Sequence, residues 1–164
     1  MTLNTSGTTI YTLTVTSGPS CSNSDQVLVT VNALPTVTAN AVSGCSGSSI
    51  ALSGSPAGGT WSVPNPYTGA STTYNHTYTD ANGYSATSSP ASITVNPLPT
   101  VTANAVSGCA GTSIALSGSP AGGTWSVPNP YTGSSSTTYT HSYTDANGCS
   151  NTSASATITV NPLP

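Results

Sequence analysis

The four cysteines of this chain, Cys21, Cys45, Cys109 and Cys149, carry its most distinctive chemistry. Two thiols can be oxidised to a disulfide, and such bonds form and persist in the oxidising environment outside the cell. The rest of the chain is polar and shows no sign of intracellular chemistry, so we interpret the cysteines as disulfide residues. We therefore expect an extracellular or cell-surface protein.

The other titratable residues do not form a catalytic set. His76 and His141 are the only histidines, and each has a single carboxylate nearby in the sequence, Asp80 or Asp145. A calcium site needs six to eight oxygen ligands, and glycoside hydrolysis needs two carboxylates, so we interpret these aspartates as turn formers. Because Leu13 occupies the equivalent upstream position, we interpret the histidines as structural strand residues. We expect no enzyme, no catalytic residue, no metal and no cofactor.

The charge composition excludes two classes of partner. The chain contains no lysine or arginine, and its formal net charge is -3. Binding to nucleic acid and to anionic membrane surfaces depends on these basic side chains, so we expect neither. No run of 18 apolar residues is present, so we expect no membrane insertion. Met1 is not followed by a signal peptide, which is typical of a mature product or an excerpt.

A repeated segment must position the cysteines. The sequence SGSPAGGTWSVPNPYTG occurs at residues 53–69 and again, unchanged, at residues 117–133. It lies in a unit that begins at Leu34 and again at Leu98, so the period is 98 − 34 = 64 positions, the size of one small β-domain. We predict a partial repeat at 1–33 and full repeats at 34–97 and 98–164.

The hydrophobic pattern predicts strands and no helix. Residues 1–33 contain two stretches of alternating apolar side chains around a Ser-Gly-Pro-Ser turn, which predicts a hairpin. In the first full repeat we expect strands at 36–41, 60–63 and 72–79, followed by an Asp-Ala-Asn-Gly turn. The Asn-Pro-Leu-Pro segment at 96–99 predicts a short, stiff linker. Short strands separated by Gly and Pro turns favour a β-sandwich.

Four features together give the chain a family resemblance: the Ser-Ile-Ala-Leu strands that follow Cys45 and Cys109, the strand tryptophans, the Tyr-Thr-Asp-Ala-Asn-Gly hairpins and the Thr-Val-Asn-Pro-Leu-Pro ends. The chain resembles the bacterial immunoglobulin-like and PKD-like tandem-repeat domains of large cell-surface and adhesin proteins. The resemblance implies an all-β fold of tandem immunoglobulin-like β-sandwich repeats with this period, joined by short Pro-rich linkers. It implies spacer, fibre or adhesive functions.

An immunoglobulin-like topology would also constrain the disulfides. Cys45 and Cys109 would lie at the first turn of their repeats, and Cys21 and Cys149 would lie at the opposite end. Because a disulfide needs Cα atoms within about 7 Å, this placement favours a Cys45–Cys149 bond across the junction of the two full repeats. A Cys109–Cys149 bond within one repeat is the alternative. In the first case, Cys21 and Cys109 are left to join one chain to the next.

The remaining candidate residues concern carbohydrate. Asn4, Asn75 and Asn151 lie in Asn-x-Ser/Thr sequons, and Trp61 and Trp125 are either core residues or sugar-stacking residues. We expect a glycosylated structural component of an extracellular fibre or stalk, polymerised head to tail by strand complementation and disulfides. Its partners would be copies of itself in a filament, and glycans. The alternative is an adhesive or carbohydrate-binding spacer module of a large secreted bacterial protein.

Overall fold

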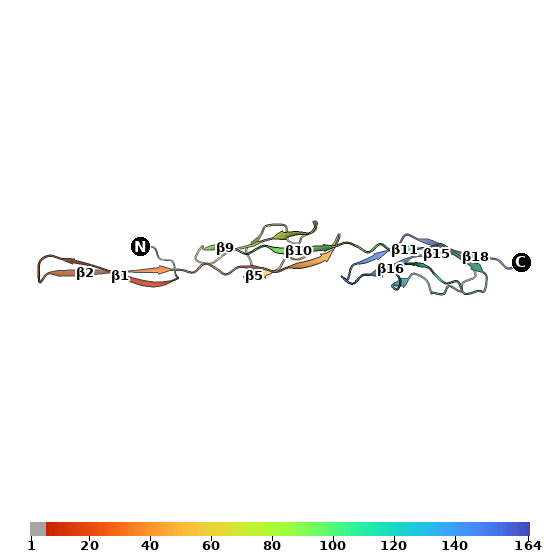
Figure 1. Ribbon diagram of the computed structural model, residues 1–164, viewed down its shortest axis with the longest axis horizontal. Coiled ribbons are helices and arrows are strands. Elements are labelled where there is room, and N and C mark those ends of the chain that lie inside the picture. The colour runs from red at the N-terminus through yellow and green to blue at the C-terminus, as the bar shows by residue number, and fades with distance from the viewer. Residues whose placement is uncertain (1–5) are drawn as a thin grey trace. The chain divides into compact units, whose positions relative to one another are not determined.

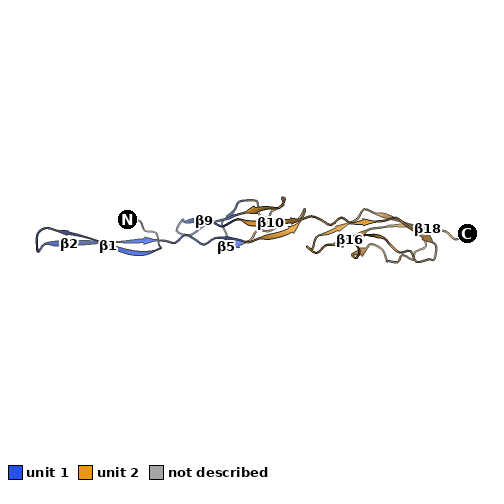
Figure 2. Ribbon diagram, in the orientation of Figure 1, with its two compact units in different colours: residues 1–39, 54–62, 75–89 blue, residues 40–53, 63–74, 90–164 orange. Residues whose placement is uncertain are grey.

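The computed structural model describes residues 6–164, and every regular element in that range is a β-strand (Figure 1). The prediction of an all-β chain is confirmed. Within the described range, no helix has the length and apolarity that a membrane span requires. The chain divides into two compact units, which are described separately (Figure 2). The repeat boundaries at 34 and 98 remain a prediction.

The hairpin predicted in residues 1–33 is present in unit 1, which comprises residues 1–39, 54–62 and 75–89. Strands β1 (Gly7–Thr16) and β2 (Ser22–Val31) pair antiparallel, and the Ser17 N–H donates to the Cys21 carbonyl at 2.7 Å across the turn. Large apolar side chains on these strands are exposed to solvent: Ile10, Leu13, Val15, Val27 and Leu28. The hairpin therefore has two open edges and no core of its own among the described residues.

The other strands of unit 1 form two small antiparallel sheets. Strand β3 (Thr38–Ala39) pairs with β5 (Gly54–Ser55). Strand β8 (His76–Thr79) lies between β6 (Thr60–Trp61) and β9 (Ser85–Thr87).

Unit 2 comprises residues 40–53, 63–74 and 90–164. In its first sheet, β10 (Ala91–Asn96) lies between β4 (Val42–Cys45) and β7 (Thr72–Tyr74). The β10–β4 pairing is parallel and aligns Asn96 with Cys45. This parallel pair was not predicted, because hydrophobic periodicity contains no information on strand direction.

Residues 98–164 contribute three more sheets to unit 2, and their pairing repeats that of the preceding strands. Strand β18 (Ala156–Asn161) pairs in parallel with β12 (Val106–Cys109) and antiparallel with β15 (Thr137–Tyr139). Strand β16 (His141–Thr144) lies between β14 (Thr124–Trp125) and β17 (Ser150–Thr152). Strand β11 (Thr102–Ala103) pairs with β13 (Gly118–Ser119).

Several strands are shorter than the sequence predicted. The strand expected at 72–79 is interrupted at Asn75, and the strands expected at 36–41 and 60–63 reduce to β3 and β6. The corresponding strands of residues 98–164 show the reason for the interruption. Strand β15 pairs with β18, whereas β16 pairs with β14 and β17, so the chain passes from one sheet to another at Thr140. The Thr140 N–H donates to the Ser126 hydroxyl instead, and the Thr140 carbonyl accepts a bond from the Ser126 N–H.

The core of residues 98–164 is built from alternating strand positions. On β18, Ala156 and Ile158 are buried, whereas the intervening threonines are exposed. Ile114, Leu116 and Tyr139 complete the buried cluster, against which six partly buried residues pack: Ala103, Val106, Trp125, Val127, Tyr131 and Val160. The hydrophobic pattern therefore determines which face of each strand packs inward.

The Tyr139 hydroxyl ties this core to two backbone segments. It lies 2.5 Å from the Asn104 carbonyl and 2.9 Å from the Ser117 carbonyl, and it accepts a bond from the Ser117 N–H at 3.2 Å. The ring itself is buried. The hydroxyl therefore provides a partner for the Asn104 carbonyl and the Ser117 N–H, whereas the Ser117 carbonyl also accepts a bond from the Asn104 N–H.

Replacing Tyr139 by phenylalanine should lower the free energy of unfolding by about 1–3 kcal/mol, because partly buried backbone groups lose a hydrogen-bond partner. Urea denaturation followed by tryptophan fluorescence measures this loss. Tyr143→Phe is the matched control, because Tyr143 is only half-buried. Equal stability of Y139F and the unmodified chain would show that the hydroxyl contributes nothing.

Candidate functional site

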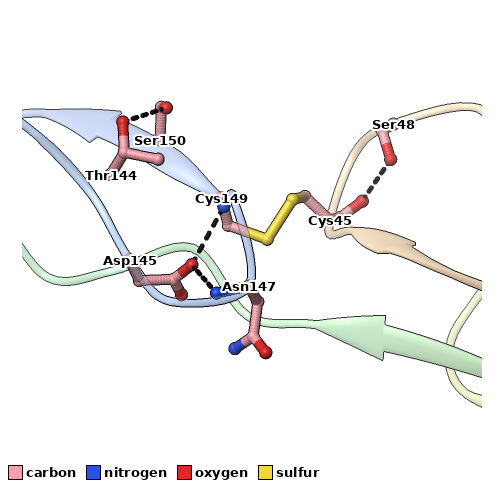
Figure 3. Close-up of a disulfide and its surroundings, with 7 residues drawn as sticks. All are labelled: Cys45, Ser48, Thr144, Asp145, Asn147, Cys149 and Ser150. Carbon is pink, nitrogen blue, oxygen red and sulfur yellow. Dashed lines mark hydrogen bonds between the residues drawn. A yellow bond between two sulfur atoms is a disulfide. The ribbon is translucent and has the colours of Figure 1, made fainter.

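The cysteine pair at the end of β4 and in the turn before β17 is the most distinctive site of the molecule. Cys45 and Cys149 form a disulfide with a Cα–Cα distance of 5.5 Å, although 104 positions separate them in the sequence (Figure 3). Of the two pairings that the sequence allowed, Cys45–Cys149 is therefore confirmed and Cys109–Cys149 is wrong. In the chain-entropy model, closing a loop of about 100 residues stabilises the folded state by about 4.7 kcal/mol.

A tight turn holds Cys149 in place. The Asp145 carboxylate accepts bonds from the backbone N–H groups of Asn147 and Cys149, both at 2.9 Å (Figure 3). Gly148 completes the turn at a φ of +79°, a conformation that glycine adopts without strain. Cys149 itself is fully buried. Asp145 thus acts as a turn former, as predicted, and it fixes the direction of the Cys149 backbone.

The Cys45 side of the bond is fixed by the sheet. Cys45 is the last residue of β4, and the next residue, Ser46, donates its N–H to the Asn96 carbonyl at 2.8 Å. The Ser48 hydroxyl donates to the Cys45 carbonyl at 2.6 Å (Figure 3). Both cysteines are therefore held by backbone contacts on either side of the bond.

A second contact accompanies the disulfide. The Asn151 side-chain amide, two residues after Cys149, donates to the Pro99 carbonyl at 2.8 Å. Sequence reasoning assigned Asn151 only to a sequon and missed this role. A signal was present: the tripeptide Cys-Ser-Asn occurs at 21–23 and at 149–151, whereas Tyr-Ser-Ala stands at 84–86. We call the Cys45–Cys149 bond and the Asn151–Pro99 contact together the joint.

The other two cysteines are exposed free thiols. Cys109 ends β12, where the Thr112 hydroxyl donates to its carbonyl at 2.7 Å. Cys21 lies in the turn between β1 and β2. Neither pairs with a cysteine of the same chain.

The histidines and tryptophans form two matching stacks. His141 is fully buried, its Nε2 lies 2.6 Å from the Gly122 carbonyl, and its ring stacks on Trp125 at a centroid distance of 4.2 Å. His76 and Trp61 stack in the same way at 4.3 Å. One face of each indole is therefore covered by a histidine, and each tryptophan is half-buried. No cluster of three or more metal-ligating side chains occurs within residues 6–164.

The sequon asparagines are engaged in backbone contacts. The Asn75 amide donates to the Ser88 carbonyl at 2.8 Å, much as Asn151 donates to Pro99. Both side chains are half-buried. Asn4 lies outside the described residues. Attachment of a glycan to Asn75 or Asn151 would therefore have to accommodate an amide that already has a partner.

Hydroxyl groups form a more open surface on the sheet β14–β16–β17. Ser142 pairs with Thr152 at 2.8 Å, and Thr144 pairs with Ser150 at 2.7 Å, across two neighbouring strands. These four side chains line a shallow groove together with Gly123, Thr124, Tyr143 and Asn151. No charged side chain of the described residues lines the groove, and its hydroxyl groups suit hydrogen bonding to a neutral ligand such as carbohydrate better than binding of ions.

Comparison with known proteins gives no family assignment: no family model matches the chain, and no curated protein matches it either.

Proposed function

We propose that the chain is a structural component of an extracellular or cell-surface fibre or stalk. It is built from tandem immunoglobulin-like β-sandwich repeats at 34–97 and 98–164, joined by a short Pro-rich linker and preceded by a partial repeat at 1–33. The observation that carries the proposal is the disulfide between Cys45 and Cys149, because its two cysteines belong to different repeats. A bond in this position strengthens the connection between repeats and creates no binding or catalytic site.

The recurrence of the strand pairing supports the repeat assignment. The parallel pair β4–β10 corresponds to β12–β18, and the antiparallel pair β8–β9 corresponds to β16–β17. The same isolated bridge links Ile50 to Tyr67 and Ile114 to Tyr131. Arrays of small domains with the same pairing are suited to spanning distance rather than to a single reaction.

The position of the disulfide also determines how tension passes through the chain. Force applied to the two ends of the chain is transmitted from Cys45 to Cys149 through the disulfide. The residues between the two cysteines therefore carry little load. Strands β5 to β16 lie between these positions, whereas β17 and β18 follow Cys149. The covalent bond therefore protects weak strand pairs from force, which is what a stalk requires.

Assembly with copies of itself is the second part of the proposal. The exposed apolar residues of β1 and β2 and the open edges of this hairpin favour pairing with strands of a second copy. Disulfides reinforce this head-to-tail contact. The exposed hydroxyls of β16 and β17 are acceptors for glycans, which keep a chain with a net charge of only -3 well solvated.

A carbohydrate-binding spacer module is the alternative function, favoured by the groove on β14–β16–β17 and by the nearby Trp125. A titration with soluble polysaccharides, followed by tryptophan fluorescence, separates the two functions. A structural chain gives no saturable shift, because Trp61 and Trp125 are stacked on histidines. A saturable shift that Ser142→Ala abolishes would support the binding module and count against a purely structural role.

A further inference from the structure

We propose that Cys109 of one chain forms a disulfide with Cys21 of a second copy of the chain, so that copies are joined head to tail. This inference rests on the proposed structural function and specifies its partner and its linkage. Both thiols are exposed, and neither is used within its own chain. The existing joint between Cys45 and Cys149 shows the geometry that the new bond would repeat.

Cys109 occupies the same structural position as Cys45. Each is the last residue of a strand that pairs in parallel with the final strand of its repeat, Cys45 opposite Asn96 and Cys109 opposite Asn161. The carbonyl of each accepts a hydroxyl bond from the third residue downstream, at 2.6 Å from Ser48 and at 2.7 Å from Thr112. The backbone therefore holds Cys109 in the same surroundings as Cys45, but the Cys109 thiol is free.

Cys21 occupies the same structural position as Cys149. Each is the last residue of a hairpin turn, and its carbonyl accepts a bond from the N–H group four residues upstream, at 2.7 Å from Ser17 and at 2.9 Å from Asp145. Both cysteines begin the tripeptide Cys-Ser-Asn. At the third turn of this kind, Tyr84 takes the place of the cysteine and is 39% exposed.

The second contact of the joint also has its counterpart. Asn151 donates to Pro99, which lies three residues after Asn96. Pro164 lies three residues after Asn161, and Asn23 lies two residues after Cys21. When Cys109 of one chain meets Cys21 of the next, Asn23 can reach Pro164 as Asn151 reaches Pro99. The chain thus carries both halves of a second joint. The half with Cys109 and Pro164 is complementary to the half with Cys21 and Asn23, and neither half is complementary to itself.

Complementary halves at different places on one chain make a heterologous contact. Such a contact leaves an unused half at each end of the assembly, so copies continue to add unless the assembly closes into a ring. A symmetric contact that joined only Cys21 to Cys21 would stop at a dimer. The distribution of free thiols therefore favours a linear polymer.

The bond forms by two thiol–disulfide exchanges with a small disulfide such as oxidised glutathione. The Cys109 thiolate attacks one sulfur of the small disulfide and releases the first glutathione as a thiolate. The Cys21 thiolate of the second copy then attacks the Cys109 sulfur of the mixed disulfide and releases the second. The two protein thiols are oxidised by two electrons in total, and the small disulfide is reduced to two thiols, which take up the two protons.

Two variants of the full chain, each lacking one of the two free cysteines, test the proposal. Cys21→Ala retains only the Cys109 thiol, and Cys109→Ala retains only the Cys21 thiol, and thiol titration of each should give one free thiol per chain. Each is incubated with oxidised and reduced glutathione, alone and in an equimolar mixture, and analysed on a non-reducing gel. We expect the mixture to give a dimer of twice the 16.1 kDa chain mass, at least about tenfold more abundant than in either variant alone.

Peptic digestion and mass spectrometry identify the bond, since trypsin has no site in a chain without lysine and arginine. The linked peptides should contain Cys21 and Cys109.

Asn23→Ala in the Cys109→Ala background should slow dimer formation, whereas the neighbouring control Ser24→Ala should not. Equal dimer formation in the mixture and in the separate variants would show unspecific oxidation and overturn the proposal. So would a wild-type chain that closes Cys21 onto its own Cys109.

The outcome also distinguishes this inference from the proposed function. A mixture that stays monomeric on the gel overturns the Cys109–Cys21 bond. If the Cys21→Ala/Cys109→Ala chain nevertheless forms larger particles in sedimentation, the structural function remains supported through non-covalent assembly. If that double variant and the wild-type chain are both monomeric, self-assembly fails as well.

Discussion

Loss of the Cys45–Cys149 bond is expected to increase the length to which a single chain extends under force by about 360 Å, since an extended chain spans roughly 3.5 Å per residue. The bond excludes 104 residue steps from the pulled path. With the bond intact, only 164 − 104 = 60 positions can be extended. Single-molecule pulling on chains tethered at both ends measures the difference directly.

The experiment is cleanest in the Cys21→Ala/Cys109→Ala background, where only this disulfide can form. Cys45→Ala in the same background is the matched variant that cannot form it. A stalk needs the short, protected path, because the strand pairs inside the loop are only two to six residues long. Equal extension of the two variants would show that the bond does not carry the load.

Replacing Gly123 by alanine is expected to lower the free energy of unfolding by about 2–5 kcal/mol, the sum of a backbone cost and an overpacking cost. Gly123 has a φ of +77°, which costs an alanine roughly 1–2 kcal/mol. A Cβ atom there would also overlap the Ser142 carbonyl and lie 2.8 Å from His141 Nε2. Overpacking of this kind adds about 1–3 kcal/mol. Chemical denaturation with urea measures the sum.

The neighbouring glycine provides the control. Gly122 has a φ of +88°, but a Cβ atom there would have no neighbour within 4 Å. Gly122→Ala should therefore show only the cost of the backbone conformation. The difference between the two variants reports the close approach of the chain to the stack of His141 and Trp125. If both variants are equally stable, the close packing at Gly123 is not a source of stability.

The sequence alone allowed the faces of the strands and several turns to be predicted, because these features depend on neighbouring residues. Ile158 and Tyr139 lie at alternating apolar positions and are buried. The Asp-Ala-Asn-Gly turn at Asp145 forms through its own carboxylate. Local chemistry is sufficient in both cases.

Other features depend on contacts between distant segments, and sequence reasoning missed them or left them open. The parallel pairing of β4 with β10 joins strands that are far apart in the sequence, and no local pattern indicates it. The choice between Cys45–Cys149 and Cys109–Cys149 depended on an assumed topology. The bond between the Asn151 amide and Pro99 was missed because a sequon offers a simpler interpretation of the same residue.

Sedimentation velocity of the oxidised wild-type chain tests the central claim, that this is a structural protein that assembles with copies of itself. The chain has a mass of 16.1 kDa, so a head-to-tail polymer gives a series of species at multiples of that mass. We expect this series after oxidation with glutathione and its collapse after addition of reductant. A single species with the mass of one chain at all protein concentrations, with Cys21 and Cys109 still free, would contradict the account.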